Sequence, residues 1–117
     1  MNAVLETSVT RAGGHTVLRV AGEVDLANAG LLDTAIRDAQ ADGADVPLVV
    51  DLADLAYIDS AGLAALHRAS RRIEEGGGSF VVVVPEGCAC ARTFEVAAFD
   101  WPVSRSWPRP GDAAEDG

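Results

Sequence analysis

The residues most suited to chemistry lie in the segment Asp51–Leu63, which runs from an apolar stretch into the start of a predicted helix. Ser60 lies at the N-terminus of that helix, directly after Asp59. A serine hydroxyl at the N-terminus of a helix can act as a nucleophile, accept a modification or cap the helix. Asp and Ser are preferred N-cap residues, because a side-chain oxygen there accepts a backbone N–H, a bond worth about 1 kcal/mol. Capping by Asp59 or Ser60 is therefore the structural alternative to any chemical role of Ser60.

Gly62 is harder to explain by local structure alone. A glycine inside a helix costs roughly 1 kcal/mol relative to alanine. We expect its missing side chain to let the surface of another protein approach Ser60 closely.

Catalysis by Ser60 is disfavoured by the surrounding sequence. The strained strand-to-helix turn of serine hydrolases requires glycine two residues before the nucleophile, where this chain has Ile58. A general base is not close by, because His67 lies about 10 Å along the same predicted helix and His15 belongs to a separate predicted element. We therefore expect no enzymatic activity, no catalytic residue and no cofactor.

The charge composition excludes further classes of function. The 117 residues include 9 Lys+Arg against 18 Asp+Glu, a formal net charge of −9, and all nine basic residues are arginines. Without a lysine, neither Schiff-base chemistry nor a P-loop phosphate site can form. Binding to nucleic acid or to an anionic membrane requires clustered positive charge, so we expect neither partner.

The length and the hydropathy pattern indicate one domain without a membrane segment. Chains below about 150 residues usually form a single domain. The longest uninterrupted apolar run, Phe80–Val84, falls far short of the roughly 20 residues that span a bilayer. Residues Met1–Val9 lack the basic and apolar regions of a secretory signal, so the expected location is cytoplasmic.

Cys88 and Cys90 are the two cysteines of the chain. They are too close in sequence for an easy disulfide, and no second cysteine pair or nearby histidine completes a zinc site. We expect them to be ordinary small residues on a helix or loop, and we expect no metal site.

The N-terminal third predicts a hairpin followed by a helix. Apolar and polar residues alternate over Val4–Thr10, the extended pattern resumes over His15–Ala21, and glycines 13 and 14 join the two strands. After a short connection, Asn28 is a candidate N-cap. Gly43 ends the helix, whose apolar stripe comprises Leu31, Leu32, Ala35, Ile36 and Ala39.

The central part of the chain predicts a strand, a helix and another strand. The apolar run within Val46–Leu52 indicates a parallel strand covered on both faces. A loop through Asp59 leads to a helix that ends at glycines 76–78, and Phe80–Val84 is expected to be a central strand. The inner stripe of this helix comprises Leu63, Leu66, Ser70 and Ile73, and its outer face carries Arg68, Arg71 and Arg72.

The C-terminal part shows weaker patterns. Cys88–Ala98 is weakly helical with Phe94 facing inward, and Val103–Trp107 is expected to form a short last strand. Residues 108–117 combine prolines, glycines and acidic residues, which predicts a disordered tail. The predicted fold class is α/β, with a mixed, mostly parallel sheet of four to five strands and helices packed against it, as one domain over residues 1–107.

Three short segments share the pattern of a known family. They are Gly22-Glu23-Val24-Asp25 after the second predicted strand, Asp51-Leu52, and Ile58-Asp59-Ser60-Ala61-Gly62-Leu63 at the helix start. In these segments, and in element order over Val4–Trp107, the chain resembles the STAS-domain family, specifically the bacterial anti-sigma factor antagonists. The Asp-Ser-x-Gly segment is the most specific part of the resemblance, which implies a STAS-like α/β fold.

This resemblance implies a regulatory switch. In the family, an anti-sigma factor that is itself a serine kinase uses ATP to phosphorylate the serine that corresponds to Ser60. The unphosphorylated form binds the kinase and frees the sigma factor, and a metal-dependent serine phosphatase resets the cycle. The implied phosphorylation site is Ser60, and the implied partner-binding residues are Asp25, Asp59, Ser60, Ala61 and Gly62.

The resemblance also leaves a second role open. Other STAS domains are subunits of stress-signalling scaffolds or of lipid-transport complexes, and in some of them the serine is not used as a switch. Antagonists usually end with a further helix, whereas here Trp107 is followed by a Pro-rich acidic tail, so the chain departs from the pattern at its end.

Two further features have both a structural and a functional interpretation. Asp25 can hydrogen-bond to its own loop, but Asn28 can take the helix cap and leave Asp25 for the partner interface that the resemblance implies. The three arginines of the second helix, at positions 68, 71 and 72, are either a solvated face or an electrostatic docking surface for an acidic partner.

A phosphate on Ser60 would change the local charge strongly. It adds roughly −1.5 to −2 charges at a helix N-terminus, where free N–H groups and the helix dipole favour an anion. We therefore expect the domain to stay folded and the effect to fall on the interface, where a dianion beside Asp59 is costly to desolvate. The net charge of −9 adds to that cost.

Overall fold

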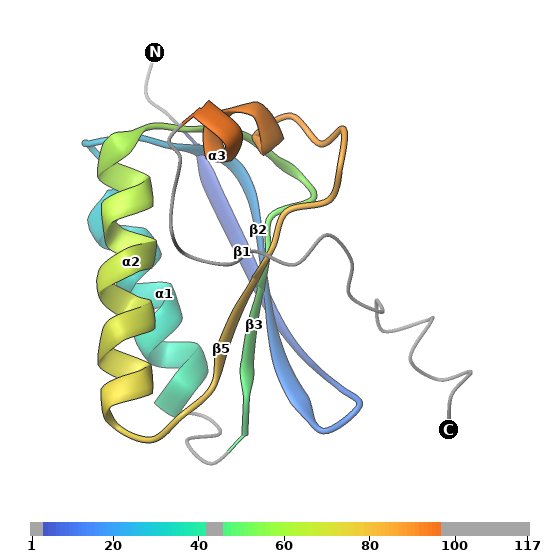
Figure 1. Cartoon of the computed structure of the whole chain (residues 1–117), viewed down its shortest axis with the longest axis vertical. Coiled ribbons are helices and arrows are strands. Elements are labelled where there is room, and N and C mark those ends of the chain that lie inside the picture. The colour runs from blue at the N-terminus through green and yellow to red at the C-terminus, as the bar shows by residue number, and fades with distance from the viewer. Residues whose placement is uncertain (1–3, 42–45, 97–117) are drawn as a thin grey trace.

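The fold has two layers, a sheet and a pair of helices that lie side by side on one of its faces (Figure 1). The structure is a computed structural model, and it describes residues 4–41 and 46–96. The two helices are α1, Ala29–Ala41, and α2, Ser60–Glu75. A short third helix, α3, spans Ala91–Val96 and lies at one end of the sheet.

A hairpin forms the first part of the sheet. Strand β1 spans Leu5–Ala12, and it pairs antiparallel with β2, which spans His15–Val24. Gly13 and Gly14 form the turn with φ of 59° and 79°. Positive φ at both central residues is typical of a two-residue turn whose twist matches that of the hairpin strands. The predicted hairpin is confirmed, and both strands extend beyond their expected ends.

Three parallel strands complete the described sheet, namely β3, Leu48–Asp51, β4, Leu55–Ile58, and β5, Phe80–Val83. The strand order is β1-β2-β3-β5, and β4 pairs with β2. Strand β2 is long enough to pair with β3 along Thr16–Arg19 and with β4 along Gly22–Val24. This mixed, mostly parallel sheet confirms the predicted fold class.

Two strand predictions are wrong. The loop expected through Asp59 contains β4, in which Leu55 and Ile58 are buried while Ala56 and Tyr57 are exposed. Four residues with this spacing carry no period-2 signal, so the pattern could not reveal the strand. Strand β5 is not central, because within the described residues it pairs with β3 alone; it is largely buried, with α2 packed against it.

The main core lies between the sheet and the two long helices. The prediction for α1 is wrong at Leu31, which is 62% exposed, because Leu32 and Ile36 face the sheet and Leu31 is turned about 100° away from Leu32. The predicted inner stripe of α2 is confirmed. The buried residues of α2 are Gly62, Leu63, Ala65, Leu66, Ala69, Ser70 and Ile73.

The C-terminal predictions are tested only in part. Helix α3 lies within the predicted range Cys88–Ala98 but begins three residues later, at Ala91, and Phe94 is buried as expected. The predicted strand Val103–Trp107, the predicted tail at 108–117 and Gly43 fall outside the described residues. None of the helices between residues 4 and 96 that the structure describes has the length and apolar character of a bilayer-spanning helix.

Candidate functional site

The ends of β2 and β4 bring the predicted site residues together. Val24, the last residue of β2, is paired in parallel register with Ile58, the last residue of β4. The Asp59 N–H continues this pairing by donating to the Val24 carbonyl at 3.1 Å. Asp25 and Asp59 therefore leave neighbouring strands at the same edge of the sheet, where α1 and α2 also begin (Figure 1).

Asp59 is the N-cap of α2. Its backbone is extended, and its Oδ1 accepts the N–H groups of Ala61 at 3.0 Å and Gly62 at 3.2 Å. Ser60 is the first residue of the helix and is exposed, and its hydroxyl has no hydrogen-bond partner among the described residues. Of the two caps that the sequence allows, the structure selects Asp59, which leaves the Ser60 hydroxyl open to another molecule.

Gly62 faces the protein interior. A Cβ at this position would lie 2.6 Å from Ile58 Cγ1 and 2.7 Å from Val24 Cγ1, closer than real Cβ contacts. The prediction that the missing side chain opens the surface beside Ser60 is therefore wrong. Gly62 instead lets the first turn of α2 pack directly on the ends of β2 and β4, and Ala61 is half-buried against the same core. This packing fixes where Ser60 lies.

The loop after β2 is held by its own side chains. Asp25 Oδ1 accepts the Ala27 N–H at 2.9 Å, and the Asp25 carbonyl accepts the N–H groups of Asn28 and Ala29. Asn28 directly precedes α1 as predicted, but its side chain does not cap the helix. Its Oδ1 accepts the Asp25 N–H and its Nδ2 donates to the Glu23 carbonyl, each at 2.9 Å. The prediction that Asn28 caps α1 and leaves Asp25 without a structural bond is therefore wrong.

Two exposed apolar side chains near this edge were not predicted from the sequence. Leu26, next to Asp25 in the loop, is 82% exposed, and Tyr57 on β4 is 49% exposed. The position of Leu26 in the short predicted connection between Asp25 and Asn28, outside the apolar stripe of the helix, was the available signal for the first of them. Both lie close in sequence to the residues that the site brings together.

The arginines of α2 do not form one cluster. Arg72 is half-buried and pairs with Asp33 of α1 at 3.2 Å, and Arg71 pairs with Glu75 at 3.5 Å. Arg68 is exposed, and no ion pair is found for it within the described residues. Arg68 comes eight residues after Ser60 in the helix, which is about 12 Å of rise. The prediction of a common outer face is wrong for Arg72. None of the three arginines is a sequence neighbour of Ser60.

The two histidines do not join the site. His67 lies on the exposed side of α2, about 10 Å of helix rise from Ser60. His15 is at the start of β2, at the opposite end of that strand from the site, where its Nδ1 donates to the Gly13 carbonyl at 2.9 Å. Within residues 4–41 and 46–96, no three His, Cys, Asp or Glu side chains are grouped to hold a metal ion.

Residues 7–103 match the family model described as "Mlab, STAS domain". The chain belongs to the STAS domain family. This STAS domain is 31% identical over 96 residues to the anti-sigma-F factor antagonist RsfB of Mycobacterium tuberculosis (strain CDC 1551 / Oshkosh), and the match covers 82% of this chain and 76% of that protein. Both comparisons agree with the resemblance seen in the sequence.

Solved structures of other proteins have a similar fold. A crystal structure of an anti-sigma factor antagonist from Mycobacterium paratuberculosis is 30% identical to this STAS domain with a TM-score of 0.72, covering 97% of this chain and 93% of that one. The Bacillus cell fate determinant SpoIIAA in its phosphorylated form is 19% identical with a TM-score of 0.57, covering 80% and 84% of the two chains. That second likeness concerns the fold alone. The two relatives with about 30% identity are named as anti-sigma factor antagonists, in agreement with the expectation of a regulatory protein without enzymatic activity.

Proposed function

We propose that this protein is an anti-sigma factor antagonist whose unphosphorylated form binds an anti-sigma factor serine kinase and frees the sigma factor. Phosphorylation of Ser60 by that kinase switches the binding off, and a serine phosphatase restores it. The observation that carries the proposal is the exposed Ser60 hydroxyl at the first position of α2, beside a cap that Asp59 already provides. The antagonist relatives at 31% and 30% identity support it. The corresponding location is the cytoplasm, where sigma factors act.

The partner-binding surface in this proposal surrounds Ser60. Asp25, Asp59 and Ala61 are half-buried, so part of each residue is accessible at the edge of the sheet where the exposed serine lies. Leu26, at 82% exposure, adds an apolar side chain that a partner can bury. Gly62 contributes by allowing α2 to pack tightly and so by positioning Ser60.

Local electrostatics explain how a phosphate could release the partner. The helix N-terminus tolerates the anion, so the free protein has no reason to unfold. At an interface the same dianion loses water beside Asp25 and Asp59. Arg68 lies about 12 Å of helix rise from Ser60, too far to compensate this charge. If only about 4 kcal/mol of this penalty is felt, the affinity falls roughly a thousandfold.

Phosphate transfer to Ser60 is the first test. The protein is incubated with ATP and its cognate anti-sigma factor kinase, and the phosphorylated residue is mapped by mass spectrometry. We expect one phosphate at Ser60 and none in Ser60→Ala, a variant that keeps the Asp59 cap. Incorporation at another residue, or none at all, would contradict the proposal.

Binding by two matched variants is the second test. Calorimetry with the same anti-sigma factor is expected to show that Ser60→Ala binds like the unmodified protein. Ser60→Asp is expected to bind at least about tenfold more weakly, because a carboxylate supplies part of the charge of a phosphate. Equal affinity of the two variants would remove the switch mechanism.

A STAS subunit that does not switch, in a stress-signalling scaffold or a lipid-transport complex, is the alternative. It is favoured by the description of the matching family model, which names no sigma factor. Failure of Ser60 to accept phosphate, combined with stable binding to proteins other than an anti-sigma factor, would support this alternative.

A further inference from the structure

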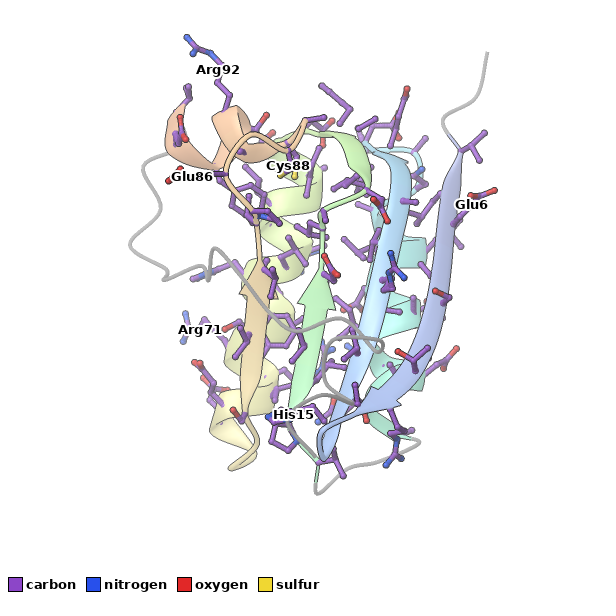
Figure 2. The ribbon with its side chains drawn as sticks, turned by 90° about the vertical axis from the view of Figure 1, so that its right-hand side faces the viewer. Glu6, His15, Arg71, Glu86, Cys88 and Arg92 are labelled. Carbon is purple, nitrogen blue, oxygen red and sulfur yellow. The ribbon has the colours of Figure 1, made fainter. Side chains whose placement is uncertain are left out.

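The two cysteines lie together in the loop between β5 and α3. Their sulfur atoms are 3.8 Å apart, and the Cys90 Sγ donates to the Leu52 carbonyl at 3.6 Å. Figure 2 shows Cys88 at the end of the sheet, beside α3. Cys90 is part of the main core and Cys88 packs against it, so packing sets the position of both sulfurs.

The two thiols have different surroundings. Cys90 is 1% exposed, whereas Cys88 is only half-buried. Burial, followed by the charge of Cys88 and the hydrogen bond with it, raises the pKa of the Cys90 thiol to about 12. Because the thiolate is the form that attacks a disulfide, the more accessible Cys88 is the first nucleophile. Cys90 remains a protonated thiol in contact with it.

We propose that Cys88 and Cys90 form a thiol–disulfide exchange site whose substrate is a low-molecular-weight disulfide. The Cys88 thiolate attacks one sulfur of the small disulfide; an S–S bond forms at Cys88, the original S–S bond breaks, and a small thiolate leaves with its electron pair. Cys90 then loses its proton and attacks the Cys88 sulfur, which closes the Cys88–Cys90 disulfide and expels the second small thiolate. The protons lost by the two cysteines protonate the two small thiolates. Two protein thiols are thus oxidised, and one small disulfide is reduced to two thiols.

The closed disulfide is expected to be reduced easily. Only Ala89 separates the two cysteines, so the chain between them is strained when the sulfurs approach from 3.8 Å to a bond length of about 2.05 Å. Strained disulfides are more readily reduced than structural ones. The site therefore suits a reversible modification better than a permanent cross-link.

Oxidation would also act on the segment that carries Ser60. The Leu52 carbonyl accepts both the Cys90 thiol and the Leu55 N–H, the latter at 3.1 Å, in the turn between β3 and β4. Strand β4 then ends at Ile58, two residues before Ser60. Closing the disulfide removes the thiol donor from this turn. The exchange reaction itself does not depend on the proposed function of Ser60.

The test uses the reduced full chain and glutathione disulfide as the probe. Samples are quenched with acid, and intact masses and peptide maps are recorded over time. We expect a single glutathione adduct at Cys88 first, and then a species two hydrogens lighter than the reduced protein, which dithiothreitol converts back. Cys90→Ala is expected to stop at the adduct. Cys88→Ser is expected to react at least about tenfold more slowly, because the remaining thiol is buried and protonated.

Circular dichroism checks that both variants are folded. If Cys90→Ala does not fold, the time course of the unaltered protein still shows which cysteine reacts first, because the adduct at Cys88 must precede the closed disulfide. A first adduct at Cys90, equal reactivity of Cys88→Ser and the unaltered protein, or no oxidised product from the folded unaltered protein would overturn the proposal.

Discussion

Asp59 and Ser60 divide two roles that either residue type can take at a helix start. Asp59 accepts the N–H groups of the first turn, and Ser60 keeps an exposed hydroxyl. A serine that served as the cap would have its oxygen engaged with the backbone and would present it less freely to a kinase. The order Asp-Ser thus separates the structural bond from the group that we propose to be modified.

The packing around Gly62 leads to a prediction about the stability of the protein. The change Gly62→Ala improves helix propensity but places a methyl group against Val24 and Ile58. We expect a net loss of about 1–3 kcal/mol in the free energy of unfolding, as for other overpacked sites. Urea denaturation measures it.

Gly30 provides the matched control for that change. It lies in the first turn of α1, and a Cβ there would meet no atom within 4 Å. Gly30→Ala is expected to be neutral or to stabilise by up to about 1 kcal/mol. A Gly62→Ala variant as stable as the unaltered protein would contradict the prediction, because it would show that α2 can shift on β2 and β4 without loss of stability.

At the scale of elements, Asp33 ties α1 to α2. It accepts from Arg37 on its own helix at 2.9 Å and from Arg72 on α2 at 3.2 Å. Burial alone raises the pKa of Asp33, but the hydrogen bond from Arg37 and the positive charges of Arg72 and Arg37 outweigh it and hold the pKa below the usual 3.8. The carboxylate is therefore a contact between the two helices.

Replacing this carboxylate should destabilise the protein in a pH-dependent way. Asp33→Asn is expected to cost about 1 kcal/mol near neutral pH, because it removes a charge from a partly buried pair. Since the folded pKa is depressed, this contribution is present above the unfolded pKa of 3.8 and disappears as the pH falls through the folded value. The gap between Asp33→Asn and the unaltered protein should therefore shrink in urea titrations at pH 3 compared with pH 7.

Asp38→Asn is the matched control, because Asp38 is an exposed residue of the same helix without an ion pair in the described structure. It should change the stability little at either pH. A gap for Asp33→Asn that stayed constant from pH 7 to pH 3 would show that its charge does not hold the two helices together.

Strand β2 brings the two parts of the proposed site together. Its ten residues pair with β3 near one end and with β4 near the other. This arrangement brings the chain after β4 to the same edge as the chain after β2. Asp25 and Ser60, 35 residues apart in sequence, consequently belong to one surface.

At the scale of the whole molecule, the acidic net charge bears on the proposed switch. The chain has a net charge of −9, and Arg71 and Arg72 on α2 are engaged with acidic side chains. A phosphate at Ser60 must therefore be compensated by the helix N-terminus or by a partner. The protein is expected to accept the phosphate on its own and to become a worse partner for an acidic surface.

Thermal stability tests this expectation directly. An anion at a helix N-terminus contributes about 0.3–1 kcal/mol, which the like charges of Asp25 and Asp59 partly offset. The Tm of the phosphorylated protein should therefore be unchanged or higher by up to about 4 °C. Calorimetry of the phosphorylated protein, with Ser60→Ala treated identically as the control, measures the difference. A fall of several degrees would mean that phosphorylation acts by unfolding the domain.

Local patterns in the sequence determined the hairpin, the two long helices, the α/β class and the family, because alternation, helical stripes and short motifs depend on neighbouring residues. They also placed Ser60 at a helix start. They missed β4, because its four residues show a strand only by pairing with β2.

Tertiary structure decided every feature that depends on segments distant in the chain. It assigned the cap to Asp59, turned Asn28 toward Glu23, and placed Gly62 against Val24 and Ile58. It also drew Arg72 away from the other arginines toward α1. None of these outcomes follows from residue type, because each depends on which atoms the fold brings within contact distance.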